Sequence, residues 1–439
     1  MQNSKKMSPL RMGVMGLQHM FAMFGATILV PLLTGLSVQV TLIAVGVGTL
    51  IFHFFAKGKV PAFLGSSFAF MVGINLITDP VGGLFAYRAV GVDPAVHVQN
   101  ILPYATGGIL VAGLVYVLLA LVVKLVGVKK FMTFLPPVVT APTVILIGIM
   151  LAPFAINQSR ENILLAVITL GIVVIAATWG RGMIKVIPIL LGLFGAYAIA
   201  LIFHALGMTN ADGGAIFDFT ATQGAGILGL PPFMAPRFSL LAILVMLPFS
   251  LATIAEHVAD MVALSTITGE DFVEDPGLAR TLIGDGLATT FSGFIGGPAS
   301  TTYGENVGVV ALTRVFNPRV VQLAAVFAVV LGFSPLFEVI IRTIPDSIIG
   351  GASFMLYGMI AAVGVRNLVE SKTDMGKTKN LTIVAVMLVT GLGLRFGQPI
   401  TFMIGETSVP IDRIGIAIAV ILGVILNIIL PDEDKKKKA

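Results

Sequence analysis

Two stretches rich in Gly, Pro, Ser and Thr interrupt the apolar sequence: Val60-Pro-Ala-Phe-Leu-Gly-Ser-Ser-Phe68 and Gly296-Gly-Pro-Ala-Ser-Thr-Thr-Tyr-Gly304. Each leaves only about half of the roughly 20 apolar residues that a membrane-spanning helix needs, and stretches of this composition form helices poorly. Extended backbone at membrane depth is tolerated only where protein buries it or where it lines a cavity. We therefore predict two short β-like segments that meet near the middle of a membrane, each leading into a half-helix. Surface hairpin loops are the alternative interpretation.

The composition of the whole chain is that of a helical membrane protein. Of its 439 residues, 56% are apolar and 11% are charged, against about 25% charged in a soluble domain. The 49 Gly and 23 Pro favour helices that are short, closely packed and sometimes broken. This composition excludes soluble enzymes, disulfide scaffolds and nucleic-acid-binding proteins. Because the chain has no Cys, thiolate metal sites and cysteine nucleophiles are excluded as well.

Apolar runs between charged or Pro/Gly clusters predict an all-α polytopic protein with fourteen membrane spans. The runs cover residues 12–34, 39–56, 60–77, 105–127, 131–154, 162–180, 184–206, 239–265, 278–296, 300–313, 318–342, 345–364, 380–396 and 413–430. The first run follows basic residues and ends without a small-residue cleavage pattern, so we expect it to be a span and not a signal peptide.

The basic residues give an independent check on this count, because an even number of spans places both termini on one side. Only six of the 27 Lys and Arg residues then fall opposite the amino terminus, namely Arg88, Arg160, Arg237, Arg342, Arg395 and Arg413. The positive-inside rule predicts that the other side, with both termini, is cytoplasmic. Residues 431–439 are interpreted as a basic cytoplasmic tail, solvated or in contact with anionic lipid.

The two interrupted stretches occupy similar places in two halves of the chain. Gln18-His19 in the first run precedes Pro61 by 42 positions from His19, and Glu256-His257 in the eighth run precedes Pro298 by 41 positions from His257. This echo predicts two repeats of seven spans each. Because seven is odd, the second repeat is expected to be inverted relative to the first, and transporters with such repeats bind their ligand where the halves meet.

Four carboxylates lie inside predicted spans, Glu256, Asp260, Asp285 and Glu305, and such residues mark functional sites by default. Glu256 and Asp260 are four residues apart and therefore share one helical face, where like charges repel. Burial and repulsion favour protonation of one member, so the pair is suited to take up and release a proton. Pairing with a buried donor, without a function in transport, is the interpretation that we favour only for Asp285.

Carboxylates beside free backbone N–H groups suit one class of ligand. A small planar heterocycle carries both ring N–H groups, which carboxylates accept, and C=O groups, to which the backbone donates. An inorganic anion fits this arrangement badly. The chain also lacks His-Glu-x-x-His and Gly-x-Ser-x-Gly, so an anion transporter and a membrane enzyme are the less favoured alternatives.

At these residues the sequence resembles the nucleobase/ascorbate transporter family. The matching strings are Gln18-His-Met-Phe-Ala-Met-Phe-Gly-Ala-Thr27, Gly65-Ser-Ser-Phe-Ala-Phe70, Glu256-His257 and Glu305-Asn-Val-Gly-Val-Val-Ala-Leu-Thr-Arg314. The last string has the family signature Gln/Glu-Asn-x-Gly-x4-Thr-Arg/Lys/Gly. The resemblance covers essentially the whole chain, and the bacterial uracil permeases form the most similar branch.

The resemblance implies a proton-coupled nucleobase importer of the inner (plasma) membrane, with no enzymatic activity and no cofactor or metal. It further implies a homodimer and alternating access, with sodium as the rival coupling ion. A core domain would comprise spans 1–4 and 8–11 (residues 12–127 and 239–342). A gate domain would comprise spans 5–7 and 12–14 (residues 131–206 and 345–430).

The resemblance also implies roles for residues of the substrate-binding site. Glu256 and Glu305 would accept hydrogen bonds from ring N–H groups, and the backbone N–H groups of Phe68 and Gly304 would donate to ring carbonyls. Tyr303 would support the pocket.

Four further residues would couple the proton or support the site. His19, Asn306 and Tyr357 would shape the hydrogen bonding around Glu305. Asp260 stands where uracil permeases commonly have His and purine transporters commonly have Asp, whereas Glu305 resembles the uracil branch. Uracil is therefore the favoured substrate, and xanthine is the alternative.

Overall fold

The computed structural model describes residues 8–81, 83–86, 89, 91–128, 130, 133, 136–222, 224–398, 400–404 and 407–431. In this part of the chain, eight helices are long and apolar enough to cross a membrane, or nine if one bent pair is counted as a single span. The predicted tail lies outside the described residues from position 432 onwards. The count of fourteen spans and the inverted repeat stay predictions.

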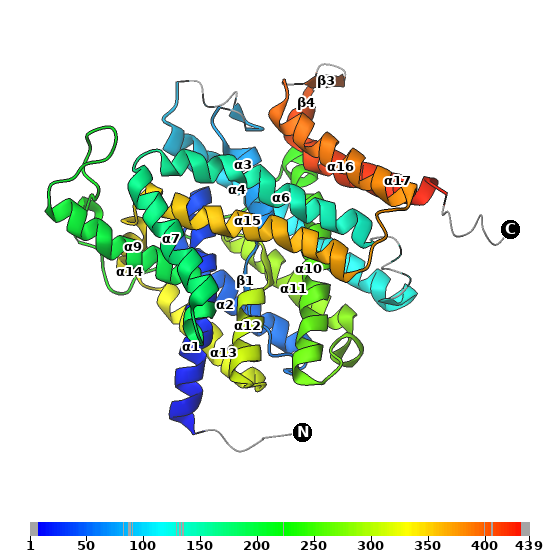
Figure 1. The fold of residues 1–439 in the computed structure, drawn as a ribbon, viewed down its shortest axis with the longest axis horizontal. Helices are drawn as coiled ribbons and strands as arrows, with labels where there is room; N and C mark the ends of the chain where they lie inside the picture. The colour runs from blue at the N-terminus through cyan, green and yellow to red at the C-terminus, as the bar shows by residue number, and fades with distance from the viewer. Residues whose placement is uncertain are drawn as a thin grey trace.

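The first half of the chain contains eight helices and one strand within the described residues (Figure 1). They are α1 (Pro9–Thr34), α2 (Val38–Phe55), β1 (Leu64–Ser66), α3 (Phe68–Thr78), α4 (Pro94–Val126), α6 (Pro137–Ser159), α7 (Ile163–Trp179), α8 (Met183–Val186) and α9 (Pro188–Ala205). A loop with a 3-10 turn at Thr220–Thr222 leads to the second half.

The second half repeats the same kinds of element. Its members are α10 (Leu240–Thr268), a π-helical turn (Val273–Gly277), α11 (Leu278–Ile295), β2 (Ser300–Thr302), α12 (Gly304–Thr313), α13 (Pro318–Gly332), α14 (Pro335–Arg342), α15 (Asp346–Glu370), α16 (Thr378–Phe396), β3 (Thr401–Ile404), β4 (Thr407–Pro410), a 3-10 turn (Ile411–Ile414) and α17 (Gly415–Ile429). β3 and β4 form a separate antiparallel pair.

Most predicted runs match helices to within a few residues, but two of the runs are each divided between two helices. Residues 318–342 form α13 and α14, which are bent by 85° at the break before Pro335. Residues 184–206 are divided between α8 and α9 at Pro188. A proline lacks the N–H that continues a helix, so each helix restarts at its proline. The predicted start at residue 105 is wrong, because α4 begins at Pro94 with Asp93 as its N-cap.

The two interrupted stretches form one antiparallel sheet, in which Leu64 pairs with Thr302, Gly65 with Thr301 and Ser66 with Ser300. All six residues are buried. The pairing satisfies backbone groups that would otherwise be unpaired inside the protein. The predicted β-like segments and the half-helices α3 and α12 that follow them are therefore confirmed, and the surface-hairpin interpretation is wrong.

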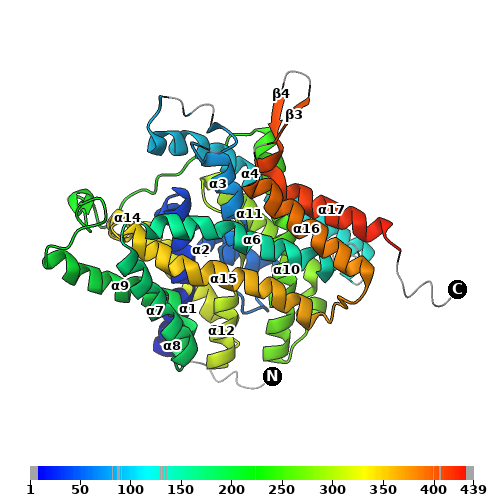
Figure 2. The ribbon, with the colours of Figure 1, turned by 45° about the horizontal axis from the view of Figure 1, so that its top comes forward.

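Small residues allow helices to approach closely at two interfaces. A Cβ on Gly113 of α4 would lie 2.7 Å from the carbonyl oxygen of Gly286 of α11, and a Cβ on Gly148 of α6 would lie 2.7 Å from that of Tyr357 of α15. Figures 1 and 2 both show α15 lying along α6. Such backbone contact is how helices pack in membranes, where lipid removes the hydrophobic drive for association.

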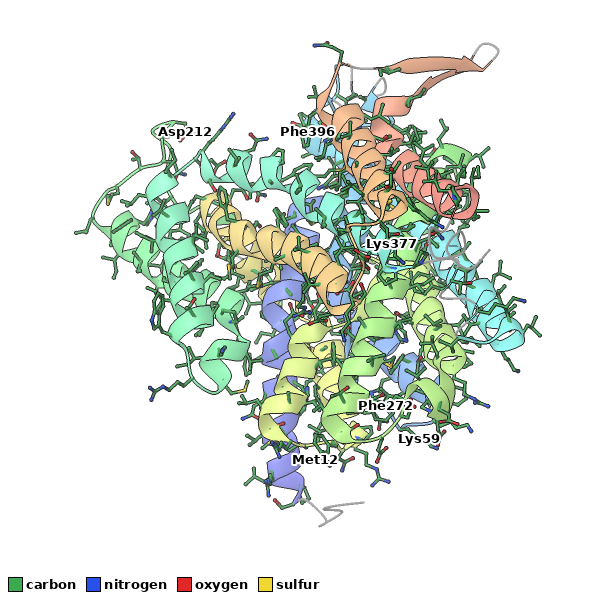
Figure 3. All side chains as sticks on the ribbon, turned by 45° about the vertical axis from the view of Figure 1, so that its right-hand side comes forward. Met12, Lys59, Asp212, Phe272, Lys377 and Phe396 are labelled. Atoms are coloured by element: carbon green, nitrogen blue, oxygen red, sulfur yellow. The ribbon has the colours of Figure 1, made fainter. Side chains whose placement is uncertain are left out.

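The helices pack in two groups. α1–α4 pack mainly with α10–α13, and α6, α7 and α9 pack with α15, with α16 and α17 beside α6. Figure 3 shows Met12, Lys59 and Phe272 at one end of the molecule and Asp212 and Phe396 at the opposite end. The division into core and gate domains stays a prediction.

Candidate functional site

A cavity of about 790 Å³ lies between the two groups of helices. Its wall includes residues of α1, α3, α10 and α12 on one side and residues of α6, α8, α9 and α15 on the other. The cavity brings together six residues predicted from the sequence: Phe68, Glu256, Asp260, Tyr303, Gly304 and Glu305. The first and last of these residues, Phe68 and Glu305, are almost 240 positions apart in the sequence. The pairing of β1 with β2 brings them together, because each residue lies just after one of these strands.

Three carboxylates face this cavity. Glu256 is exposed to it, and Asp260 lies one turn further along α10 and is half-buried. Because residues four apart lie on one face of a helix, α10 presents both carboxylates to the same space. Glu305 is the second residue of α12, is half-buried, and lines the cavity as well.

The half-helices bring backbone donors to the same place. α3 begins at Phe68 and α12 at Gly304, and neither N-cap residue makes a side-chain capping bond. The first N–H groups of a helix have no partner within it, and the helix dipole makes this end partly positive. The cavity therefore presents N–H donors next to carboxylate acceptors.

Tyr303 lines the cavity while its hydroxyl is held by the first half of the chain. The hydroxyl donates to the carbonyl oxygen of Ser66 at 2.8 Å and lies 3.2 Å from the Ser66 hydroxyl, which donates to the carbonyl of Thr27 at 3.1 Å. The ring lies over Gly65, where any Cβ would overlap it. Tyr303 thus joins β1 and α1 to the start of α12.

His19 and Asn306 contact each other behind the cavity. The Asn306 side-chain amide donates to the His19 carbonyl oxygen at 3.0 Å and lies 3.2 Å from His19 Nδ1. Both side chains are buried, and neither lines the cavity. Tyr357 is likewise buried in α15, and its neighbour Leu356 is the lining residue. The structure places these three residues around the site, outside its wall.

Asp285 is not part of the cavity wall. Its Oδ2 is 3.0 Å from Nδ1 of His257, both side chains are fully buried, and the ring of Phe52 packs edge-on against that of His257. A buried carboxylate with a single close partner is costly unless it is held in place. Pairing with a buried donor is the arrangement that the sequence favoured for Asp285.

Four polar residues of the cavity wall were not predicted as site residues: Lys185 of α8, Thr301 of β2, and Arg366 and Asn367 of α15. The basic pair was interpreted only as a determinant of orientation, because many basic residues occur in short loops. No local pattern in the sequence distinguishes the two that face the cavity.

Comparison of the sequence with known families identifies the chain. The family model Xan_ur_permease, described as "Permease family", matches residues 11–400. The chain belongs to the nucleobase/ascorbate transporter family. This assignment confirms the resemblance seen in the sequence, and it makes the chain an integral membrane permease and not an enzyme.

Curated relatives in this family match over nearly their full length. The uracil permease of Bacillus subtilis (strain 168) is 38% identical, with 96% of this chain and 93% of the relative covered. The putative pyrimidine permease RutG of Escherichia coli (strain K12) is 40% identical, with 87% and 82% covered. The uracil permease of the same strain is 36% identical, with 94% and 90% covered.

Solved structures with a similar fold are also membrane transporters. The transmembrane domain of the cyanobacterial bicarbonate transporter BicA has a TM-score of 0.58 at 17% identity, covering 95% of this chain and 97% of that chain. SLC26A9 has a TM-score of 0.63 at 15% identity, covering 95% and 65%. At these identities, the similarity establishes the fold and leaves the ligand open.

Proposed function

We propose that this permease imports uracil together with a proton. The observation that carries the proposal is the single cavity that holds both Glu256 and Glu305 beside the uncapped starts of α3 and α12. Uracil alternates ring N–H and C=O groups around one edge. The carboxylates accept from its N–H groups, and the backbone N–H groups of Phe68 and Gly304 donate to its carbonyls.

Uracil is favoured over xanthine by the relatives. Those 36–40% identical to this chain over more than four-fifths of its length include uracil permeases and a putative pyrimidine permease. Xanthine is the second candidate because of Asp260. Purine transporters of the family commonly have Asp at this position, and Asp260 faces the cavity one turn from Glu256. Competition of unlabelled xanthine against labelled uracil separates the two substrates.

Transport is proposed to occur by alternating access. The cavity extends along α12 to Leu312 and reaches the exposed side chains of Lys185 and Arg366. Both residues belong to the side of the protein that the basic residues predict to be cytoplasmic, which supports an inward-facing state for this conformation. Toward the other end, Tyr197 of α9 and Thr343 hydrogen bond at 2.7 Å, and Phe24 of α1 packs edge-on against Phe337 of α14.

Proton coupling follows if uracil binds well only when a cavity carboxylate is protonated, because binding and protonation are then linked equilibria. The proposal includes fourteen spans as two inverted repeats, a core domain that moves against a gate domain, and a homodimer with both termini in the cytoplasm of the cell. Sodium coupling is the rival mechanism.

The test is uptake of radiolabelled uracil into proteoliposomes that contain the Glu256→Gln variant. We expect wild-type uptake to collapse with a protonophore and to survive replacement of sodium, and E256Q to lose or uncouple uptake. Glu270→Gln, an exposed carboxylate in the loop after α10, is the matched control. If E256Q takes up uracil as fast as the wild-type protein at both acidic and neutral pH, Glu256 has no part in the mechanism.

A further inference from the structure

The charged residues of the cavity are divided by sign between its two walls. α10 and α12 contribute three carboxylates, Glu256, Asp260 and Glu305, whereas α8 and α15 contribute two cations, Lys185 and Arg366. Within the described residues, no charge of the opposite sign lines either wall. The cavity is therefore dipolar, and a ligand that fills it meets acceptors on one side and cations on the other.

The two cations lie at the outer end of the cavity. The lining residues of α15 are Leu356, Met359, Ile360, Val363, Arg366 and Asn367, which share one helical face. At 1.5 Å per residue, this face extends about 15 Å from Leu356 to Arg366. Both Lys185 and Arg366 are exposed. The short helix α8, which carries Lys185, packs against α12, and Figure 2 shows these two helices side by side.

Neither cation is neutralised by a strong partner. Arg366 has an ion pair with Glu370 at 3.6 Å, in which both side chains are more than 60% exposed, and such pairs contribute little. Across the cavity, the charge of Arg366 also interacts with that of Asp260, but the two form no ion pair within 4 Å. Lys185 has no ion pair within the described part of the chain. Lys59 is different, since Asp275 pairs with it. Neither cation is therefore held in a close, buried ion pair, and both can contact an anion that enters the cavity.

We propose that this cavity also binds a pyrimidine nucleoside monophosphate from the cytoplasmic side, with the base toward Glu256 and Glu305 and the phosphate at Lys185 and Arg366. The inference rests on the proposed function, because the base would use the uracil site. A cavity of about 790 Å³ has space beyond a single ring. Guanidinium and ammonium groups are the side chains that bind phosphate oxygens most strongly.

Such a ligand would inhibit the permease and would not be transported. Its glycosylated ring nitrogen has lost the N–H that a carboxylate accepts, and its phosphate is held by the wall opposite to the carboxylates. A ligand that contacts both walls resists their movement past each other. The compound is the product expected when a ribose phosphate is attached to the imported base, so binding it would slow import when that product accumulates.

The experiment measures displacement of radiolabelled uracil from the purified full-length protein in detergent, where both ends of the cavity are accessible. The competitors are uridine 5′-monophosphate, uridine and inorganic phosphate. We expect the monophosphate to displace uracil at least tenfold more effectively than uridine, because one charge-assisted contact accounts for about a factor of ten. Phosphate alone should not displace uracil. Equal potency of uridine and its monophosphate, or displacement by phosphate alone, would overturn the proposal.

Variants assign the effect to the two cations. Arg366→Gln and Lys185→Gln should each weaken displacement by the monophosphate about tenfold relative to displacement by unlabelled uracil in the same variant. Glu370→Gln controls for loss of the Arg366 ion pair. Arg319→Gln controls for loss of a positive charge outside the cavity. If R366Q and K185Q leave the ratio unchanged, the phosphate does not bind there.

The outcomes distinguish this inference from the proposed function. If unlabelled uracil displaces the label but the monophosphate does not, only this inference fails. If unlabelled uracil does not compete at all, the proposed function fails first. In everted membrane vesicles the added monophosphate should inhibit uracil transport, and in right-side-out vesicles it should not. The reverse pattern would contradict the cytoplasmic location of the cations.

Discussion

The two half-helices have the same backbone design and opposite chemistry. Each follows a three-residue strand, begins without a side-chain cap and ends after ten or eleven residues. Counted from the start of each helix, Ala69 of α3 corresponds to Glu305 of α12, and Phe70 corresponds to Asn306. In α3 every residue except Phe68 is buried, whereas α12 exposes Gly304 to the cavity and places Glu305 beside it.

The two half-helices therefore contribute different groups to the site. The first half-helix is an apolar support that adds one backbone donor and one aromatic ring to the site. The second half-helix provides the charge. Backbone pairing requires that both segments be extended where they meet, because the strands satisfy each other's hydrogen bonds. No such requirement acts on the side chains, which are free to differ.

Removing the apolar support should have the largest effect. Phe70 is fully buried and packs against Phe249, so Phe70→Ala should lower the free energy of unfolding by about 3 to 5 kcal/mol. The melting temperature of the detergent-solubilised protein measures this loss. Phe294→Ala is the control, because it removes an aromatic ring that is exposed on the surface of the protein and should change the free energy of unfolding little. A Phe70→Ala protein as stable as wild type would show that α3 is not the support.

Removing the charge should act on binding and leave stability nearly intact. Glu305→Gln retains the shape of the side chain but loses a charged acceptor, so uracil should bind about tenfold to a hundredfold more weakly. Equilibrium binding of radiolabelled uracil measures the change, with the melting temperature as the readout for folding. Phe68→Ala, at the start of the other half-helix, should weaken binding less. If Phe68→Ala weakens uracil binding more than Glu305→Gln does, the charge of Glu305 is not the main contribution of α12 to binding.

Asn306 tests whether contact between the halves positions the charge. Asn306→Ala removes both contacts with His19 and leaves a buried carbonyl with one donor fewer, at a cost of about 1 to 3 kcal/mol. The melting temperature should fall, and uracil binding should weaken without being abolished. Asn317→Ala, which removes an N-cap at an exposed helix start, is a control for loss of an amide elsewhere. Unchanged binding in N306A would limit this contact to folding.

Tyr303→Phe should have a smaller effect. The variant keeps the ring over Gly65 and loses only the hydroxyl contacts with Ser66, which corresponds to about 1 kcal/mol. The ratio of uracil affinities in variant and wild type measures it. Tyr104→Phe changes a tyrosine that lies outside the cavity wall and is the matched comparison. A loss as large as that of E305Q would mean that the hydroxyl contacts uracil.

The smallest effect is expected where the halves meet at the surface. Lys59, next to the first interrupted stretch, hydrogen bonds to Asp275 in the π-helical turn before α11, and this contact lowers the pKa of the Asp275 carboxyl below its usual value. A lowered folded-state pKa means that the stabilisation is present at neutral pH and is lost as pH falls through that pKa. Because the pair is exposed, Asp275→Asn should leave the neutral melting temperature nearly unchanged and slightly reduce its dependence on acidic pH. A large loss at neutral pH would contradict this.

The sequence alone determined that residues 60–68 and 296–304 interrupt their helices and that carboxylates lie within apolar runs. Gly, Pro, Ser and Thr at residues 60–68 and 296–304 disfavour a helix, and a carboxylate in an apolar run is costly wherever that run folds. These are local properties, so the strands, the half-helices and Glu256 and Glu305 could be predicted. The family signature at 305–314 added the expected ligand class.

Only the tertiary structure decided which side chains share a space. The overlap of Tyr303 with the place where Gly65 would carry a Cβ, the pairing of His257 with Asp285, and the arrival of Lys185 and Arg366 in the cavity join residues that are distant in sequence. The break before Pro335 likewise became clear only in three dimensions, because the apolar pattern continues across it. Local energetics determine what a segment avoids, whereas the partners of a side chain depend on how the helices pack.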